Sequence, residues 1–117
     1  MIFVDAPDSS VQQLPRSIGL HRPDVFARSR SADHEIIGEA KTPTDLDSTR
    51  SKQQLGVYLA SAAESKNRAL LLATTWDYVR YANSLLKFLC KKVDISIPNY
   101  AVLDQFGNVM IRSNGWI

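Results

Sequence analysis

The sequence predicts an α/β fold, in which a small mixed sheet is flanked by helices in a three-layer-like arrangement. Short apolar and β-branched runs, which are typical of strands, stand on both sides of a segment with helical periodicity from 47 to 65. A helix of this length makes a crossover connection, so the strands on its two sides are expected to be parallel. The chain then carries two further strand-like runs, which predict an antiparallel pair.

The composition is that of an ordinary globular protein. The chain has 117 residues, of which 44% are hydrophobic and 22% charged, and this suits one compact domain over 1–117. A net charge of +2 and a pI near 8.8 permit a nucleic-acid partner without requiring one. No run of residues is expected to cross a membrane or to act as a signal peptide. The single Cys90 suits a reducing cytosol, so we expect a cytoplasmic location.

The first third of the chain predicts strands. The run 2–4 is short and β-prone, and the segment 5–16, with two prolines and two serines, predicts a loop or an edge extension. The stretch 17–21 is interpreted as a further strand, which Pro23 would break or restart at an edge. The runs 24–27 and 34–41 predict two strands joined by a polar turn, which together form a hairpin.

The first helix is expected over 47–65. Pro43 ends the strand before it, and either Thr44 or Asp47 can cap the helix. The apolar residues that recur at helical spacing in this segment are Leu55, Tyr58, Leu59 and Ala62. These residues predict the face of the helix that packs on the sheet.

A central strand and a second helix follow. The run 69–74 is short and almost wholly apolar, which predicts a strand buried in the middle of the sheet. The second helix is expected to begin at Trp76 or Asp77 and to end at Lys91. Its predicted buried stripe consists of Val79, Ala82, Leu85, Leu86 and Leu89. The aromatic residues of this region are interpreted as core and helix packing, not as a platform for stacking bases: Trp76, Tyr78, Tyr81 and Phe88.

The last part of the chain predicts a terminal β-hairpin within 99–117. The segment 94–98 is expected to be extended, and the runs 99–103 and 109–112 predict two strands joined by a turn. An edge strand offers unpaired main-chain groups, and the chain is short, so we predict a homodimer.

Charged residues gather on the predicted hairpin. Pro23 and Asp24 stand at the first of its strands, and Glu39-Ala40-Lys41 ends the second. Because strand side chains alternate between faces, Glu39 and Lys41 point the same way, and pairing of the strands brings Asp24 close to Glu39. Two carboxylates beside one ammonium suit a hard divalent metal with a cation next to it.

This pattern resembles the PD-(D/E)XK nuclease superfamily, whose signature is a Pro-Asp at one strand and an acid-x-Lys on the next. The family often carries a Gln-x-x-x-Tyr on the following helix, which Gln54-Leu55-Gly56-Val57-Tyr58 matches. The segment 45–54 is also similar to the Holliday-junction-resolvase-like and virus-type replication-repair branch. The resemblance covers about a third of the chain. It implies a restriction-endonuclease-like core and metal-dependent cleavage of phosphodiester bonds in DNA.

The resemblance implies a metal site and a cationic group beside it. Asp24 and Glu39 would hold Mg²⁺ or Mn²⁺ through carboxylate oxygens, and Ala40 would add a main-chain carbonyl. The metal would acidify a bound water and neutralise charge on the scissile phosphate. Lys41 would lie beside the attacking water and stabilise the transition state by its charge. The plainer interpretation is that these are surface charges on a hairpin.

Further residues are assigned to catalysis and to binding of the substrate. Gln54 and Tyr58 are one helical turn apart, so Gln54 would orient the water or contact phosphate, and Tyr58 would contact substrate. A helix that packs Tyr58 on the sheet and leaves Gln54 exposed explains the same pattern equally well. Arg50 and Arg22 would bind the phosphate backbone by charge, although solvated basic residues are the commoner explanation.

The sequence departs from the family at its beginning. The family usually starts with a helix that contributes a further Glu to the metal site, whereas the residues before Ser17 predict no clear N-terminal helix. The missing ligand would then come from elsewhere in the chain or from a partner subunit. Alternatively, the domain has lost catalysis and binds DNA or a protein partner. A third interpretation is an unrelated small α/β interaction module, in which the order of the motifs is accidental.

Overall fold

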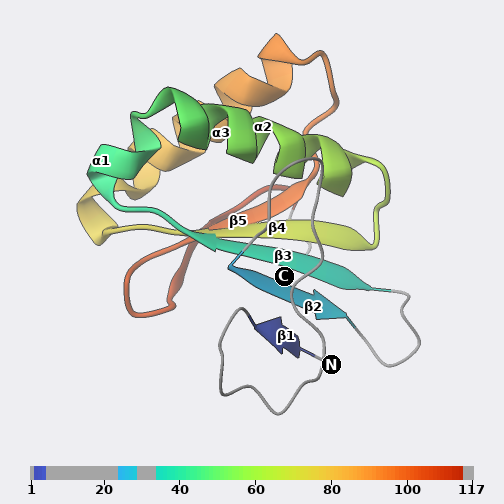
Figure 1. Cartoon of the computed structure of the whole chain (residues 1–117), viewed down its shortest axis with the longest axis horizontal. Coiled ribbons are helices and arrows are strands. Elements are labelled where there is room, and N and C mark those ends of the chain that lie inside the picture. The colour runs from blue at the N-terminus through green and yellow to red at the C-terminus, as the bar shows by residue number, and fades with distance from the viewer. Residues whose placement is uncertain (1, 5–23, 29–33, 115–117) are drawn as a thin grey trace.

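The computed structural model describes residues 2–4, 24–28 and 34–114, and these form a mixed sheet with helices packed on it (Figure 1). Spatial order in the sheet follows sequence order, from β1 to β6. The strand β3 pairs parallel with β4, and β4 pairs parallel with β5, whereas the outer pairs are antiparallel. The strands are β1 Ile2–Val4, β2 Val25–Arg28, β3 Glu35–Ala40, β4 Arg68–Ala73, β5 Asn99–Leu103 and β6 Val109–Arg112. The predicted α/β class, hairpins and parallel central strands are confirmed.

Helices fill the two crossover connections. Helices α1 (Pro43–Leu46) and α2 (Thr49–Ala63) join β3 to β4, and a 3₁₀ turn (Trp76–Tyr78) with α3 (Val79–Lys92) joins β4 to β5. Figure 1 shows α2 and α3 side by side on one face of the sheet. Two right-handed crossovers that advance in the same direction across a sheet leave their helices on the same face. The described residues therefore form two layers, and the expected three-layer-like arrangement is wrong for this part of the chain.

The single helix predicted over 47–65 is divided in two. The Thr42 hydroxyl accepts from the Asp45 N–H at 3.1 Å, and the Asp45 carboxylate accepts from the Thr42 N–H at 3.4 Å, which makes a capping box for α1. The Ser48 hydroxyl accepts from the Ser51 N–H at 3.1 Å and caps α2. Neither of the two caps predicted from the sequence is used. The chain therefore turns at Asp47 and begins a second helix that lies over the sheet.

The core lies between the two long helices and one face of the sheet. The register of β3, β4 and β5 sets Ile37, Leu70 and Tyr100 side by side, and all three are buried. Every position predicted for the buried stripes of the two helices is buried: Leu55, Tyr58, Leu59, Ala62, Val79, Ala82, Leu85, Leu86 and Leu89. Strand alternation places Glu39, two residues after Ile37, on the same helix-covered face. A charged side chain therefore enters the edge of the core.

The aromatic residues around the start of α3 lie largely in solvent. Trp76 is 67% exposed and Phe88 is 58% exposed, and Tyr78 and Tyr81 are exposed as well. The prediction that these residues pack in the core is wrong, because they fall outside the apolar stripe that turns α3 towards the sheet.

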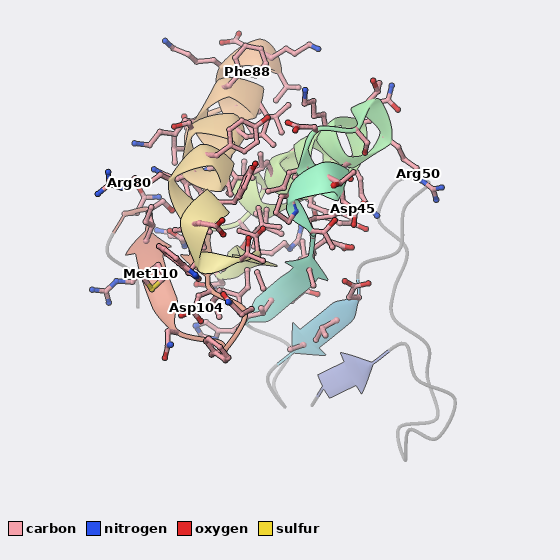
Figure 2. All side chains as sticks on the ribbon, turned by 90° about the vertical axis from the view of Figure 1, so that its left-hand side faces the viewer. Asp45, Arg50, Arg80, Phe88, Asp104 and Met110 are labelled. Atoms are coloured by element: carbon pink, nitrogen blue, oxygen red, sulfur yellow. The ribbon has the colours of Figure 1, made fainter. Side chains whose placement is uncertain are left out.

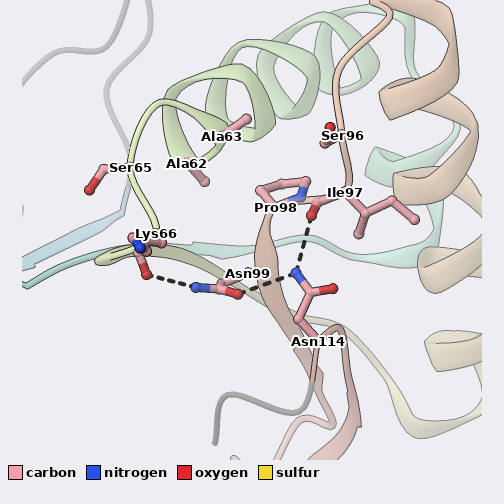
Figure 3. A pocket seen from close by; sticks show the side chains of 9 residues that line it. All are labelled: Ala62, Ala63, Ser65, Lys66, Ser96, Ile97, Pro98, Asn99 and Asn114. Atoms are coloured by element: carbon pink, nitrogen blue, oxygen red, sulfur yellow. Dashed lines mark hydrogen bonds between the residues drawn. The ribbon is translucent and has the colours of Figure 1, made fainter.

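Amide side chains close the amino ends of the parallel strands (Figure 3). The Asn99 side chain donates to the carbonyl of Lys66 at 2.9 Å, and the Asn114 side chain donates to the carbonyl of Ile97 at 3.1 Å and to the Asn99 side chain at 3.3 Å. The small pocket at this end is lined in part by Asn99 and Asn114, whose side-chain amides thus bind the protein itself. In open α/β sheets, ligands are expected at the opposite, carboxyl ends of the strands.

Some predictions fall outside the residues that the structure describes. These are the loop or edge extension over 5–16, the strand over 17–21, and Arg22. Within the described ranges, every helix is too short or too polar to span a membrane.

Candidate functional site

The pairing of β2 with β3 brings the two predicted metal ligands together. Val25 lies opposite Gly38, and continuing this register by one residue sets Asp24 opposite Glu39. A Cβ atom added at Gly38 would lie 3.1 Å from the Cβ atom of Val25, so glycine allows the strands to approach closely here. The Ala40 N–H donates to Asp24 Oδ2 at 2.9 Å, which holds the Asp24 carboxylate against the end of β3.

Glu39 forms the buried end of this site. It is 6% exposed, and its Oε2 atom has no hydrogen-bond partner among the described residues. Burial and then the negative charge of Asp24 raise the pKa of Glu39 from 4.5 to about 7, although the ammonium of Lys41 opposes the change. Two neighbouring carboxylates with an unpaired oxygen repel each other unless a proton or a cation lies between them. At neutral pH either a proton on Glu39 or a cation beside the two carboxylates would relieve this repulsion.

Lys41 is held next to Glu39 by a side chain from α2. Its Nζ atom lies 3.9 Å from Glu39 Oε1 and donates a hydrogen bond to Gln54 Oε1. The Gln54 Nε2 atom in turn donates to the hydroxyl of Tyr58 at 3.1 Å. The Gln54 side chain thus joins the buried Tyr58 hydroxyl to the Lys41 ammonium through two hydrogen bonds. In this structure Gln54 acts as a positioning residue for Lys41.

Tyr58 supports the site from inside the core. Its side chain is fully buried, which leaves no exposed surface for the direct contact with substrate that the sequence predicted. Burial, followed by the negative charge of Glu39, raises the pKa of Tyr58, so its hydroxyl stays protonated at neutral pH. The Gln-x-x-x-Tyr motif therefore supports the site through the hydrogen bond between Gln54 and Tyr58.

The remaining predicted residues do not meet at this centre. Arg50 is exposed at the start of α2, and Figure 2 shows its side chain pointing outwards from the same side of the molecule as Asp45. The main-chain group of Ala40 that contacts Asp24 is its N–H, and the use of its carbonyl as a metal ligand stays a prediction. Arg22 lies outside the described residues.

The donor set fits a hard divalent cation. Among the residues with described positions, no group of three His, Cys, Asp or Glu side chains converges. Asp24 and Glu39 supply two carboxylates, and Mg²⁺ is commonly held by only one or two carboxylates because it keeps several of its waters. The buried Oε2 of Glu39 has no hydrogen-bond partner among the described residues, so a cation that paired with it would offset the cost of burying it.

A pocket next to this centre was not predicted. It has a volume of about 320 Å³ and opens where β3 and β4 end. It is lined by Ala40, Lys41, Thr42, Asp45, Ala73, Thr74, Thr75 and Gln105. A signal for it was present in the sequence, because Thr74 and Thr75 directly follow an apolar central strand, and ligands of parallel sheets bind where such strands end.

Comparison with protein-family descriptions, with curated proteins and with solved structures finds no match to this chain. The geometry of Asp24, Glu39, Lys41 and Gln54 therefore carries the functional argument.

Proposed function

We propose that this protein is a metal-dependent endonuclease that hydrolyses phosphodiester bonds in DNA, built on a restriction-endonuclease-like core of the PD-(D/E)XK superfamily. The observation that carries the proposal is the state of Glu39, a buried carboxylate with an unpaired oxygen that lies between Asp24 and the ammonium of Lys41. A site with only a structural role would be expected to pair that oxygen with a donor. The order of motifs along the chain supports the same function.

Each residue has a part in the proposed reaction. Asp24 and Glu39 hold Mg²⁺ or Mn²⁺, which when bound supplies positive charge at the scissile phosphate and acidifies water. Lys41 faces the same space, and its ammonium stabilises the negative charge that develops on the phosphate oxygens. Gln54 keeps Lys41 in place, and the buried Tyr58 fixes the orientation of Gln54.

Binding of the DNA backbone is proposed to use exposed basic residues near the site. Arg50 is exposed in the first turn of α2, the helix that also carries Gln54. Arg22 precedes Asp24 by two residues in the sequence and is proposed for the same role. Such contacts give affinity without sequence readout, so binding is expected to weaken steeply as salt rises.

The test of this function is cleavage of DNA by the purified wild-type chain. A supercoiled plasmid, a flap and a four-way junction would be incubated with Mg²⁺, with Mn²⁺ and with a chelator. We expect nicking or resolution that needs the metal and stops with the chelator. Absence of cleavage on all three substrates under every metal condition would overturn the proposal.

The second candidate function is a nuclease-fold domain that has lost catalysis and binds DNA or a protein partner. The observation that favours it is that two carboxylates, and not three, come together among the described residues. Calorimetric titration with Mg²⁺ separates the two candidates. The nuclease is expected to bind Mg²⁺ through Asp24 and Glu39, whereas a degenerate domain would bind DNA or a protein partner without the metal.

Removal of the Lys41 ammonium is expected to inactivate the enzyme without emptying the metal site. Lys41→Ala should lower the cleavage rate by about 10²–10³-fold, because a charge aimed at the transition state is lost. Gln54→Ala should lower it by about tenfold, since Lys41 remains but loses its support. The exposed neighbour Gln53 provides the matched control, and Gln53→Ala should cut like wild type. Loss of Mg²⁺ binding in Lys41→Ala, measured by calorimetry, would contradict the assigned role.

We also propose a homodimer that pairs through the edge strand β6. This strand ends the sheet among the described residues, and its Val109 and Met110 side chains are 45% and 52% exposed. Light scattering at micromolar concentration should give twice the chain mass of 13.1 kDa. Met110→Lys should shift the mass towards one chain, and a wild-type protein that scatters as a monomer would refute the dimer.

A further inference from the structure

A groove lies between the helices α2 and α3, which pack side by side on the sheet (Figure 1). Its apolar lining comes from Val57 and Ala60 on α2 and from Leu89 and Val93 at the end of α3, and Val93 is 45% exposed. The volume of about 560 Å³ exceeds that of the pocket beside the candidate metal centre. None of the residues placed at that centre lines this helix groove, so it is a separate apolar surface.

Gly56 lines the helix groove from the interior of α2. Glycine inside a helix is destabilising relative to alanine, so its presence calls for a reason. At Gly38 that reason is packing, because an added Cβ atom would lie 3.1 Å from the Cβ atom of Val25. At Gly56 an added Cβ atom would meet nothing within 4 Å beyond its chain neighbours and the main chain of its own helix. The missing side chain instead leaves room for an occupant to approach the main chain of α2.

The two helices beside the groove carry positive charge only. Two basic residues belong to α2 and four to α3, and neither helix contains an acid. Each helix contributes one of these cations to the groove lining, Lys52 from α2 and Lys92 from α3. The ion pairs among the described residues are made by Lys41 and Arg68, so Lys52 and Lys92 have no acidic partner there. The groove thus combines apolar surface with an unpaired ammonium on each of its two helices.

This combination distinguishes between the classes of acidic ligand. The backbone of DNA carries the right charge, but it has no apolar stripe that could fill the groove. A fatty acid has an apolar chain, but its single carboxylate can pair with the cation of one helix only. An amphipathic helix with acids on both sides of its apolar stripe has both features, because side chains at i, i+3, i+4 and i+7 share one face.

We infer that the helix groove binds an acidic amphipathic helix of a partner protein. The apolar stripe of that helix packs against the groove lining and approaches the main chain of α2 at Gly56. Its acids pair with Lys52 on one side and Lys92 on the other. Burial of the apolar stripe provides most of the affinity, whereas the charges select the partner and speed its association.

The test begins with selection from a displayed library of helical peptides of about 16 residues. Each peptide has an apolar stripe at helical spacing, and the positions beside the stripe are varied among Asp, Glu, Lys and Arg. The library is passed over Gly56→Leu to remove peptides that bind elsewhere, and it is then selected on wild type. We expect the recovered peptides to be acidic on both sides of the stripe. Recovery of no peptide, or of peptides with basic flanks, would overturn the inference.

Gly56→Leu is expected to close the groove while keeping the fold. The new side chain has free space above α2, and it takes the place of the bound helix. The dissociation constant of a recovered peptide, measured by fluorescence anisotropy, should rise at least about tenfold. Because leucine is a better helix former than glycine, the unfolding temperature of the variant should not fall. A folded Gly56→Leu protein that binds the peptide as tightly as wild type would overturn the inference.

Reversal of one groove charge provides a test that does not depend on Gly56. Lys92→Glu should weaken binding of the recovered peptide by about tenfold, because it places an acid against an acid. The matched control is Lys91→Glu, an equal change of charge at an exposed neighbour that does not line the groove. That variant should weaken binding less than about threefold. Equal effects of the two variants would assign binding to the general charge of α3, and the groove would be wrong.

Binding of DNA and cleavage of DNA separate the groove from the proposed function. Gly56→Leu should bind duplex DNA in a chelator as tightly as wild type, since phosphate contacts do not need the apolar lining. A tenfold loss of DNA binding in this variant would assign the groove to nucleic acid and overturn the inference. If acidic peptides bind the groove while no metal supports cleavage, the groove stands and the nuclease fails. If the wild type cleaves DNA but selection recovers no peptide, the nuclease stands and the groove fails.

Discussion

Loss of either carboxylate of the candidate site is expected to abolish Mg²⁺-dependent cleavage of DNA. Asp24→Asn and Glu39→Gln keep the shape of the side chain but remove an anionic ligand, and both residues are proposed to act on one ion. We expect each variant to cut at least about a thousandfold more slowly than wild type. The amide oxygen at position 24 can still accept from the Ala40 N–H, so the strand pairing should survive. Initial rates of plasmid nicking measure the effect, and circular dichroism checks the fold.

The matched control for this experiment is an acid on the same molecule that is remote from the site. Glu64 lies at the end of α2 with its side chain 73% exposed, and Glu64→Gln should cut like wild type. Binding of DNA in a chelator should persist in all three variants, because the proposed contacts of basic residues with the phosphate backbone do not need the metal. Wild-type rates in both Asp24→Asn and Glu39→Gln would show that the site is misplaced, and the resemblance to the nuclease superfamily would then concern the fold alone.

The pairing of the two acids could be predicted because it depends on local rules. Side chains alternate along a strand, and a hairpin has one register that keeps its apolar residues on one face, so Asp24 and Glu39 had to meet if the hairpin formed. The parallel pairing of β3 with β4 followed in the same way from the long helix between them. These features need only the sequence of the segment itself.

Features that depend on how elements cross in space were harder to predict. The contact of Lys41 with Gln54 requires α2 to start above the end of β3, and this follows from the break between α1 and α2 at Asp47. The break comes from two successive caps, at Thr42 and Ser48, which a single run of helical periodicity conceals. For this reason the sequence alone does not decide whether Gln54 and Tyr58 contact substrate or pack within the protein.

The hydrophobicity of Trp76 was misleading. Aromatic residues are usually buried, and this favours a core position when the only other information is composition. The apolar stripe of α3 can nevertheless be recognised in the sequence, and Trp76 lies before its first residue. Residues that depart from the local pattern are often functional, because binding surfaces must expose groups that the core would otherwise take.

The burial that suits Glu39 to the proposed role of metal ligand should also make its carboxylate destabilising in the metal-free protein. The pKa of Glu39 is about 7 in the folded chain and near 4.5 when unfolded. A carboxyl whose pKa is raised by folding favours the folded state below its unfolded pKa, and that contribution is lost as the pH rises through the folded pKa. In a chelator, the stability of wild type relative to Glu39→Gln should therefore fall between about pH 4.5 and pH 7.

Glu39→Gln is accordingly expected to be more stable than wild type at pH 8 in a chelator, by about 1–3 kcal/mol in the free energy of unfolding. The difference should vanish below about pH 3.5, where the Glu39 carboxyl is protonated in both states. Urea unfolding at several pH values measures it, and the exposed Glu64→Gln variant should show no such dependence. Mg²⁺ at a hundredfold excess over its dissociation constant should offset most or all of this difference, since it stabilises wild type by about 2.7 kcal/mol and leaves Glu39→Gln unchanged. A Glu39→Gln protein that is less stable than wild type at pH 8 without metal would mean that the carboxylate is satisfied within the fold, and the principal argument for a cation site would fail.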